Sequence, residues 1–345
     1  MGESIPADIA AELEGSDRNA YLEQRLFVLS PFNNFWTTLL IFAVLMGSFA
    51  VAATLSGVDV IVIDAHGVGI SRTARFAVLF SLLITTVLGM QRFSRVRERA
   101  DFMAHAAVLK GGVADACQVT ALTPGNAKLG RATLIGVAVG FLLCWTIVRP
   151  TPALQTIATY AWFCVVTVLI SVLFARGVTL TRGAQRDARG NIENRLIVDL
   201  LRVDRLSVIG RSAARAALIW FVISAVICLF FIGGGIDPFT IALLLGCAAM
   251  GIWIFVATME SVSRRIRAAK SAELEHVRTR IDAARNDPGE RLQGLLAYEA
   301  RIQAVHEWPF DQTTLVRVFA SAFILTLPWF GQAIVQYFVE HLGPK

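Results

Sequence analysis

The sequence predicts an all-α integral membrane protein with about seven transmembrane helices, cytoplasmic helical extensions and a helical hairpin. Of its 345 residues, 55% are hydrophobic and only 17% are charged, whereas about a quarter of the residues in soluble domains are charged. A hydrocarbon core of about 30 Å is crossed by a helix of ~20 apolar residues. Seven apolar runs reach or approach that length, at 36–57, 74–91, 132–148, 157–175, 215–233, 238–258 and 313–339.

Residues 1–35 are predicted to form an acidic arm that ends in an interfacial amphipathic helix at Tyr21 to Leu29. The arm lacks the basic and apolar regions of a signal peptide, which predicts that the N-terminus stays on the side of synthesis. Two interpretations of the arm stay open, because it either lies at the membrane surface or docks on the basic connections described next. Its acidic residues are Glu3, Asp8, Glu12, Glu14, Asp17 and Glu23.

The distribution of Lys and Arg predicts the orientation. The connections 92–131, 176–215 and 259–312 carry seven, nine and nine basic residues, which is 25 of the 32 in the chain. Because basic connections remain in the cytoplasm, these three are predicted to be cytoplasmic. The N-terminus is then cytoplasmic and the C-terminus external. The same residues predict contacts with anionic lipids at the cytoplasmic face.

Residues 36–258 form the predicted six-helix membrane region. Within it, residues 130–135 resemble residues 214–219 at an offset of 84 positions, which suggests an internal duplication as one interpretation. An outer connection contains Asp64 and His66. This weak external polar pair either binds a divalent ion or titrates near neutral pH, or consists simply of exposed turn residues. Two ligands are too few for a metal site, so no metal is predicted.

The cytoplasmic connections are predicted to be helical. In residues 259–312, apolar residues recur at steps of three and four on both sides of an Asn-Asp-Pro-Gly turn at 286–289, as in an antiparallel coiled coil. A similar stripe in residues 191–204 predicts that the fourth membrane helix continues inward. The seam residues of the hairpin are Leu274, Val277, Ile281 and Ala284, followed by Leu295, Tyr298, Ile302 and Val305.

Residues 313–345 contain the last apolar run, which is unusually polar and carries a helix breaker. Pro328 removes a backbone donor and frees a carbonyl, which a membrane tolerates only beside protein or water, and Gly331 permits close approach of a neighbour. The two residues form a candidate hinge. At ~100° per residue, four polar side chains fall on one face and Glu340 lies just beyond it, which makes five pore-lining candidates: Arg317, Ser321, Gln332, Gln336 and Glu340. The alternative stays open that Gln332 and Gln336 bond neighbouring helices while Glu340 reaches external water.

The sequence HEWPFDQTT at 306–314, continuing through LVRVF, resembles a segment in a group of bacterial polytopic membrane proteins. In that group a basic helical hairpin precedes a WPFD-like corner and a final membrane span. The resemblance covers about Arg264 to Gly331. It implies a bacterial inner (plasma) membrane location, and it carries no known activity.

Most catalytic classes are not supported by the motifs. The chain has no GxxxxGK[ST], no HExxH and no recognisable nucleophile turn, so we expect no enzyme, no cofactor and no metal. The hairpin 259–312 has as many acidic as basic residues, nine of each, which argues against nucleic-acid binding despite a sequence pI of about 9.4.

Two functions remain. The first is a channel-like or passive transport protein, expected to be a homo-oligomer, whose last helix lines the path with its polar stripe. The alternative is a membrane scaffold or signalling component that recruits a protein partner through its cytoplasmic helices, with 259–312 as the candidate surface.

Overall fold

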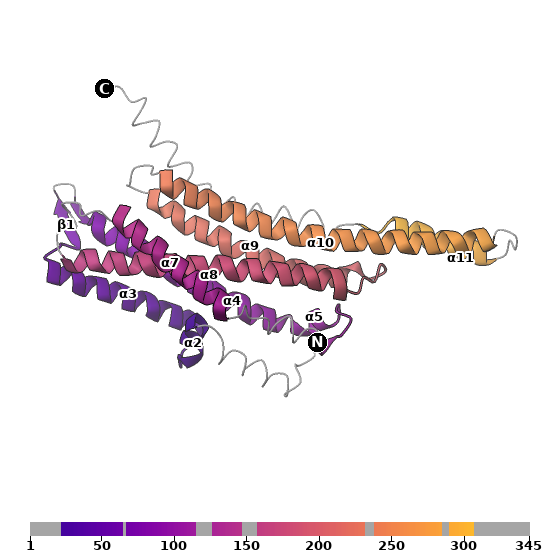
Figure 1. Ribbon diagram of the computed structural model, residues 1–345, viewed down its shortest axis with the longest axis horizontal. Helices are drawn as coiled ribbons and strands as arrows, with labels where there is room; N and C mark the ends of the chain where they lie inside the picture. The colour runs from indigo at the N-terminus through magenta and orange to yellow at the C-terminus, as the bar shows by residue number, and fades with distance from the viewer. Residues whose placement is uncertain are drawn as a thin grey trace, which may run out of the picture.

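The described helices alternate in direction along one long bundle (Figure 1). The structure is a computed structural model and describes residues 22–64, 67–114, 126–146, 157–231, 238–284 and 290–306. Among these residues, six helices are long and apolar enough to cross a membrane. The chain is therefore a nearly all-helical, multi-pass membrane protein. The seventh predicted run, 313–339, lies outside the described residues.

The six helices pair into three out-and-back hairpins, which bring all three basic connections to one end of the bundle (Figure 1). We call this end the arginine-rich side, and the opposite end the β-hairpin side. The assignment of the arginine-rich side to the cytoplasm stays a prediction. The helices are α3 (Asn34–Ser56), α4 (Arg72–Ala100), α7 (Asn126–Thr146), α8 (Ile157–Arg195), α9 (Ser207–Cys228) and α10 (Pro238–Ala284).

Local capping explains where the first two long helices begin. The side chain of Asn33 accepts a hydrogen bond from the Trp36 amide at 3.0 Å, and that of Ser71 accepts one from the Ala74 amide at 3.2 Å. These contacts satisfy amide groups that a helix start leaves without partners. At the other end of α3, Gly57 has a φ of 62° and closes the helix with a left-handed cap.

The β-hairpin side carries two short strands that the all-helical prediction missed. Strand β1 (Ile61–Asp64) pairs antiparallel with β2 (Gly67–Ile70), with Asp64 opposite Gly67. Val60 and the first three residues of β1 form a run of β-branched residues, which favours extended backbone. At four residues each, the strands leave the fold class unchanged.

The main core lies between α3, α4, α8, α9 and α10 and is rich in aromatic rings. Phe49 of α3 meets Trp162 of α8 edge to face, with ring centroids 5.1 Å apart. The Trp162 indole also donates to the Ser48 hydroxyl at 2.9 Å. The outward faces stay apolar, since Val44, Leu134 and Phe141 are each more than 60% exposed. Such surfaces suit contact with lipid.

Helices α7 and α8 approach so closely that glycine is required. A Cβ atom on Gly136 would lie 2.6 Å from the Cα of Val172, and one on Gly140 would lie 2.6 Å from the Cα of Val168. The two glycines form a GxxxG pattern, which lets helix backbones meet in a membrane. Sequence analysis did not identify this pattern, although the motif was readable.

Helix α2 (Leu22–Leu29) lies at the arginine-rich side of the membrane region. Phe27 is buried in the main core, whereas Leu26 and Leu29 stay exposed. Glu23 forms an ion pair with Arg176 of α8, whose Nη2 donates to the Glu23 carboxylate at 3.0 Å. One acidic residue of the predicted arm thus contacts a basic residue of the bundle, while residues 1–21 lie outside the described residues.

Helices α8 and α10 are much longer than a membrane span requires. At 1.5 Å per residue, the 39 residues of α8 extend about 58 Å and the 47 residues of α10 about 70 Å. Both therefore continue beyond a hydrocarbon core of about 30 Å. Figure 1 shows these extensions at the arginine-rich side. The same side holds α5 (Phe102–Ala106), η2 (Val203–Leu206) and α11 (Glu290–Gln303), whereas η3 (Leu229–Phe231) follows α9 at the β-hairpin side, where Phe230 packs against Phe76 and Phe80 of α4.

The fourth membrane helix continues inward beyond its predicted span 157–175, as expected, but the stripe at 191–204 is helical only as far as Arg195. Beyond it, Leu196 forms an antiparallel bridge with Leu109, and residues 197–202 form a loop. The apolar residues of the stripe are still used, because Ile192 and Leu196 are buried in a second core.

Candidate functional site on the arginine-rich side

The site residues predicted from the sequence are not tested by the structure. All pore-lining candidates and both hinge residues lie outside the described residues: Arg317, Ser321, Gln332, Gln336, Glu340, Pro328 and Gly331. Asp64 ends strand β1, but its side chain and all of His66 are outside the described part. Among the described residues, no group of three or more His, Cys, Asp or Glu side chains could hold a metal ion.

The described membrane helices satisfy many of their own hydroxyl groups. Thr85, Ser171 and Ser224 each donate to the carbonyl four residues earlier in the same helix, at 2.8–2.9 Å. A hydroxyl bonded in this way needs no water and no partner helix. These polar residues therefore give no support for an aqueous path through the part of the bundle described here.

A second hydrophobic core lies at the arginine-rich side. It joins the end of α8, the start of α9 and the part of α10 near Val262 and Ile266, which are both fully buried. Backbone bonds tie it to the segment after α5, because the Lys110 amide donates to the Arg195 carbonyl at 2.8 Å and the Ile197 amide donates to the Val108 carbonyl at 2.9 Å. This part of the molecule is thus folded and packed rather than a set of loose loops.

The loop from Ile197 to Leu206 is held by three local hydrogen bonds. The Asp199 carboxylate accepts from the Leu201 amide at 3.0 Å, and the Asp199 carbonyl accepts from the Arg202 amide at 3.1 Å. The Arg205 amide then donates to the Arg202 carbonyl at 3.1 Å. A bond over three residues closes a turn of 3₁₀ type, in which the first and fourth side chains lie on the same face. Arg202 and Arg205 therefore share one side of the loop.

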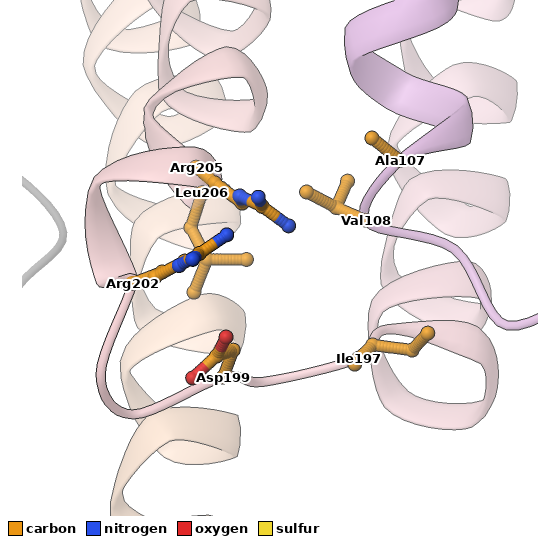
Figure 2. Close-up of a pocket in the computed structure, with 7 residues that line it drawn as sticks. All are labelled: Ala107, Val108, Ile197, Asp199, Arg202, Arg205 and Leu206. Atoms are coloured by element: carbon orange, nitrogen blue, oxygen red, sulfur yellow. The ribbon is translucent and has the colours of Figure 1, made fainter.

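A cavity of about 190 Å³ opens between this loop and the segment after α5. Figure 2 shows the side chains of Arg202 and Arg205 extending across it from one side, with Ala107 and Val108 on the other. Neither guanidinium group has an ion-pair partner among the described residues. The cavity is lined by Ala107, Val108, Ile197, Asp199, Arg202, Arg205 and Leu206.

A cluster of charged residues connects α4, α5 and α9 beside this region. The Arg215 guanidinium donates to the Asp101 carboxylate at 2.7 Å, and Arg211 approaches the same carboxylate at 3.6 Å. The Nε and Nη2 atoms of Arg215 are buried and have no hydrogen-bond partner among the described residues. His105 Nδ1 lies 2.9 Å from the Asp101 carbonyl. Burial lowers the pKa of His105 below its usual 6.5, which favours the neutral imidazole.

Helices α10 and α11 form a projecting antiparallel pair (Figure 1). Val277 of α10 and Ile302 of α11 are both buried. Arg278 pairs with Glu299 at 3.1 Å, and the Tyr298 hydroxyl lies 3.2 Å from the Glu273 carboxylate. Lys270 donates to the carbonyls of Gln303 and Val305, at 2.8 and 3.0 Å, and so satisfies the C-terminal end of α11.

In the sequence, Arg202 and Arg205 stand out only as members of the basic connection 176–215. The signal that was available is their spacing of three after Asp199, a residue type that favours turns. The partners across the cavity could not be identified in this way, because Val108 lies almost 90 positions before Ile197.

These features define a class: a multi-pass helical membrane protein with a packed, arginine-rich assembly at one end and a helical pair projecting from it. Neither protein-family models, nor curated proteins, nor solved structures match the chain.

Proposed function

We propose that the protein is a membrane scaffold or signalling component that recruits a protein partner through the α10–α11 pair. The observation that carries this proposal is the length of α10. Its predicted membrane span ends near residue 258, and the 26 residues that follow continue the same helix for about 39 Å. A rigid element of this length, anchored directly in the membrane, is suited to holding a binding surface at a set distance from the bilayer.

The pair is stiff enough for such a role. Because α10 is one continuous helix from Pro238 to Ala284, the projecting part shares its axis with the part inside the bundle. The hydrogen bonds from Lys270 to the carbonyls at the end of α11 and the ion pair between Arg278 and Glu299 hold the second helix against the first. The extension is therefore a two-helix element instead of a single exposed helix.

The outer surface of the pair is available to a partner. Arg280 on α10 is exposed, and Leu296 on α11 is 48% exposed, although leucine is usually buried. An exposed apolar side chain among charged ones is a common feature of protein interfaces. The equal numbers of acidic and basic residues in 259–312 favour a protein partner over nucleic acid.

Site-specific photo-crosslinking of the full-length protein in cells tests the proposal. A photoreactive residue is placed at Arg280 or Leu296, and as controls at the buried positions Val277 and Ile302. A further surface control is Ile70, which is 68% exposed at the β-hairpin side. We expect the two exposed hairpin positions to give a discrete adduct with one other protein, and the three controls to give none.

The positions at which adducts form, and the variants that abolish them, decide between the outcomes. An adduct that is lost when Leu296 is changed to Glu, and kept when the exposed Gln293 is changed to Glu, supports a specific surface on α11. The absence of any protein adduct at Arg280 and Leu296 contradicts the scaffold proposal. Adducts of equal yield at Ile70 would indicate non-specific proximity and would contradict it as well.

The location and orientation belong to the same proposal. We place the chain in a bacterial inner membrane, with the arginine-rich side in the cytoplasm and in contact with anionic lipids, because 25 of the 32 basic residues lie in the connections at that side. Labelling of single cysteines introduced at residues 3 and 343 from outside intact cells tests the orientation. Equal access to both positions would contradict it.

The channel function remains a second prediction, resting on the polar stripe of residues 313–339 and on a homo-oligomer. Liposomes containing the purified protein test it, with Gln332→Leu as the variant expected to abolish ion flux while the protein stays folded. Flux without any α10–α11 adduct would favour the channel over the scaffold. An unchanged flux in the Gln332→Leu variant would remove this residue from the path.

A further inference from the structure

We infer that the cavity beside Arg202 and Arg205 binds a small phosphate-bearing anion from the aqueous phase. None of the seven lining residues belongs to α10 or α11, and the binding assay below needs no protein partner, so it tests the inference independently of the proposed function. Three points support it: two guanidinium groups placed on one side, an apolar opposite wall, and a position outside the membrane spans 157–175 and 215–233 predicted from the sequence.

The arrangement of the arginines is suited to an anion. The hydrogen bond from the Arg205 amide to the Arg202 carbonyl places both side chains on one face of the turn. Among the described residues neither has an ion-pair partner, so both forks of N–H donors are available. Planar guanidinium groups bind phosphate oxygens through two parallel hydrogen bonds each. The two positive guanidinium groups match the double negative charge of a phosphate monoester.

The neighbouring carboxylate of Asp199 does not neutralise the two arginines. Asp199 accepts a hydrogen bond from the Leu201 amide at 3.0 Å and so stabilises the loop that carries the arginines. No ion pair joins Asp199 to Arg202 or Arg205 in the described part of the chain. The loop is therefore ordered by its own backbone contacts before any ligand arrives, which reduces the entropic cost of binding.

The opposite wall and the volume limit the ligand. Ala107, Val108 and Ile197 present apolar surface to the cavity, so the ligand is expected to have a short carbon body next to its phosphate group. A volume of about 190 Å³ suits a small ligand such as a three-carbon phosphate ester.

The position favours a soluble anion over a lipid headgroup. Along α8, the 20 residues from 176 to 195 separate the predicted membrane span from the loop, which is about 30 Å of helix. Along α9, the eight residues from 207 to 214 give about 12 Å. Both distances exceed the roughly 5–8 Å occupied by the headgroup region on one side of a bilayer.

Calorimetric titration of the full-length protein in detergent micelles with glycerol 3-phosphate tests the inference. Ionic strength is held constant with chloride, because exposed arginines are screened by salt. We expect saturable binding with a dissociation constant of about 1 mM or lower. Each of Arg202→Gln and Arg205→Gln should weaken binding by about tenfold or more, since each removes charge-assisted hydrogen bonds. Arg280→Gln, an exposed arginine on the projecting part of α10, should leave binding unchanged.

Further arms make each outcome decisive. Should Arg205→Gln fail to fold, Arg205→Lys keeps the charge, and its loss of paired donors should still weaken binding several-fold. Succinate binding more tightly than glycerol 3-phosphate would overturn the phosphate assignment. Loss of binding in nanodiscs containing phosphatidic acid, relative to nanodiscs of phosphatidylcholine alone, would show that the site takes a lipid headgroup and overturn the soluble source. Heat signals no different from those of chloride would overturn the site itself.

Discussion

The contact between α7 and α8 predicts a strong and specific effect of one methyl group. In a Gly136→Ala variant, the new Cβ would lie 2.6 Å from the Cα of Val172, 2.9 Å from the carbonyl oxygen of Ser171 and 3.0 Å from the amide nitrogen of Val172. All three atoms belong to the backbone of α8, so a side-chain rotation cannot relieve the overlap. Ordinary contact begins at 3.4 Å, and the helices must therefore separate locally by roughly 0.8 Å.

The expected cost can be estimated against a matched control in the same helix. Overpacking of this kind destabilises the folded protein by about 1–3 kcal/mol. Replacing Gly by Ala within a helix stabilises the helix by up to about 1 kcal/mol. Gly130 has no neighbouring atom within 4 Å of a built Cβ. Because the helix-propensity gain is shared by both substitutions, the difference between Gly136→Ala and Gly130→Ala should be about 1–3 kcal/mol.

Reversible unfolding in mixed micelles, with an increasing fraction of sodium dodecyl sulfate and detection by circular dichroism, measures this difference. We expect Gly130→Ala to unfold at or above the midpoint of the unmodified protein and Gly136→Ala clearly below it. A Gly136→Ala variant as stable as Gly130→Ala would refute the close approach of α7 and α8. Gly140→Ala, whose Cβ would lie 2.6 Å from the Cα of Val168, should behave like Gly136→Ala.

Three other perturbations follow from the same packing. Asp101→Ala leaves the mostly buried Arg215 without its 2.7 Å partner and should destabilise by about 3 kcal/mol. Adding Arg215→Met should recover most of this loss in the same unfolding assay. Burial lowers the pKa of His105 against the opposing effects of Asp101 and Glu98, so the folded state binds fewer protons than the unfolded state and stability should fall as pH decreases through about 6.5. His105→Gln should flatten that dependence, and an unchanged slope would assign it to other groups. Ser48→Ala removes the acceptor of the Trp162 indole and should cost about 0.6 kcal/mol, with a red-shifted or altered Trp emission as an independent signal.

The membrane helices were predictable because their main requirement is local. A run of apolar residues avoids water wherever it lies in the chain, and a helix satisfies its own backbone. The predicted span 36–57 corresponds to α3 at Asn34–Ser56, and the predicted starts at 157 and 238 coincide with those of α8 and α10. The hydrophobic seam around Val277 and Ile302 was also readable, since it depends on steps of three and four along one segment.

Only the tertiary structure decided how α8 ends and what surrounds the loop that follows. Apolar residues at 192, 196, 200 and 203 follow a helical pattern. The helix nevertheless ends at Arg195, where the backbone of Arg195 and Ile197 pairs with that of Lys110 and Val108. That pairing joins segments almost 90 positions apart, and the sequence of neither segment predicts that it pairs with the other. Composition therefore determined which segments are apolar enough to enter the membrane, whereas contacts between distant segments created the cavity that presents Arg202 and Arg205.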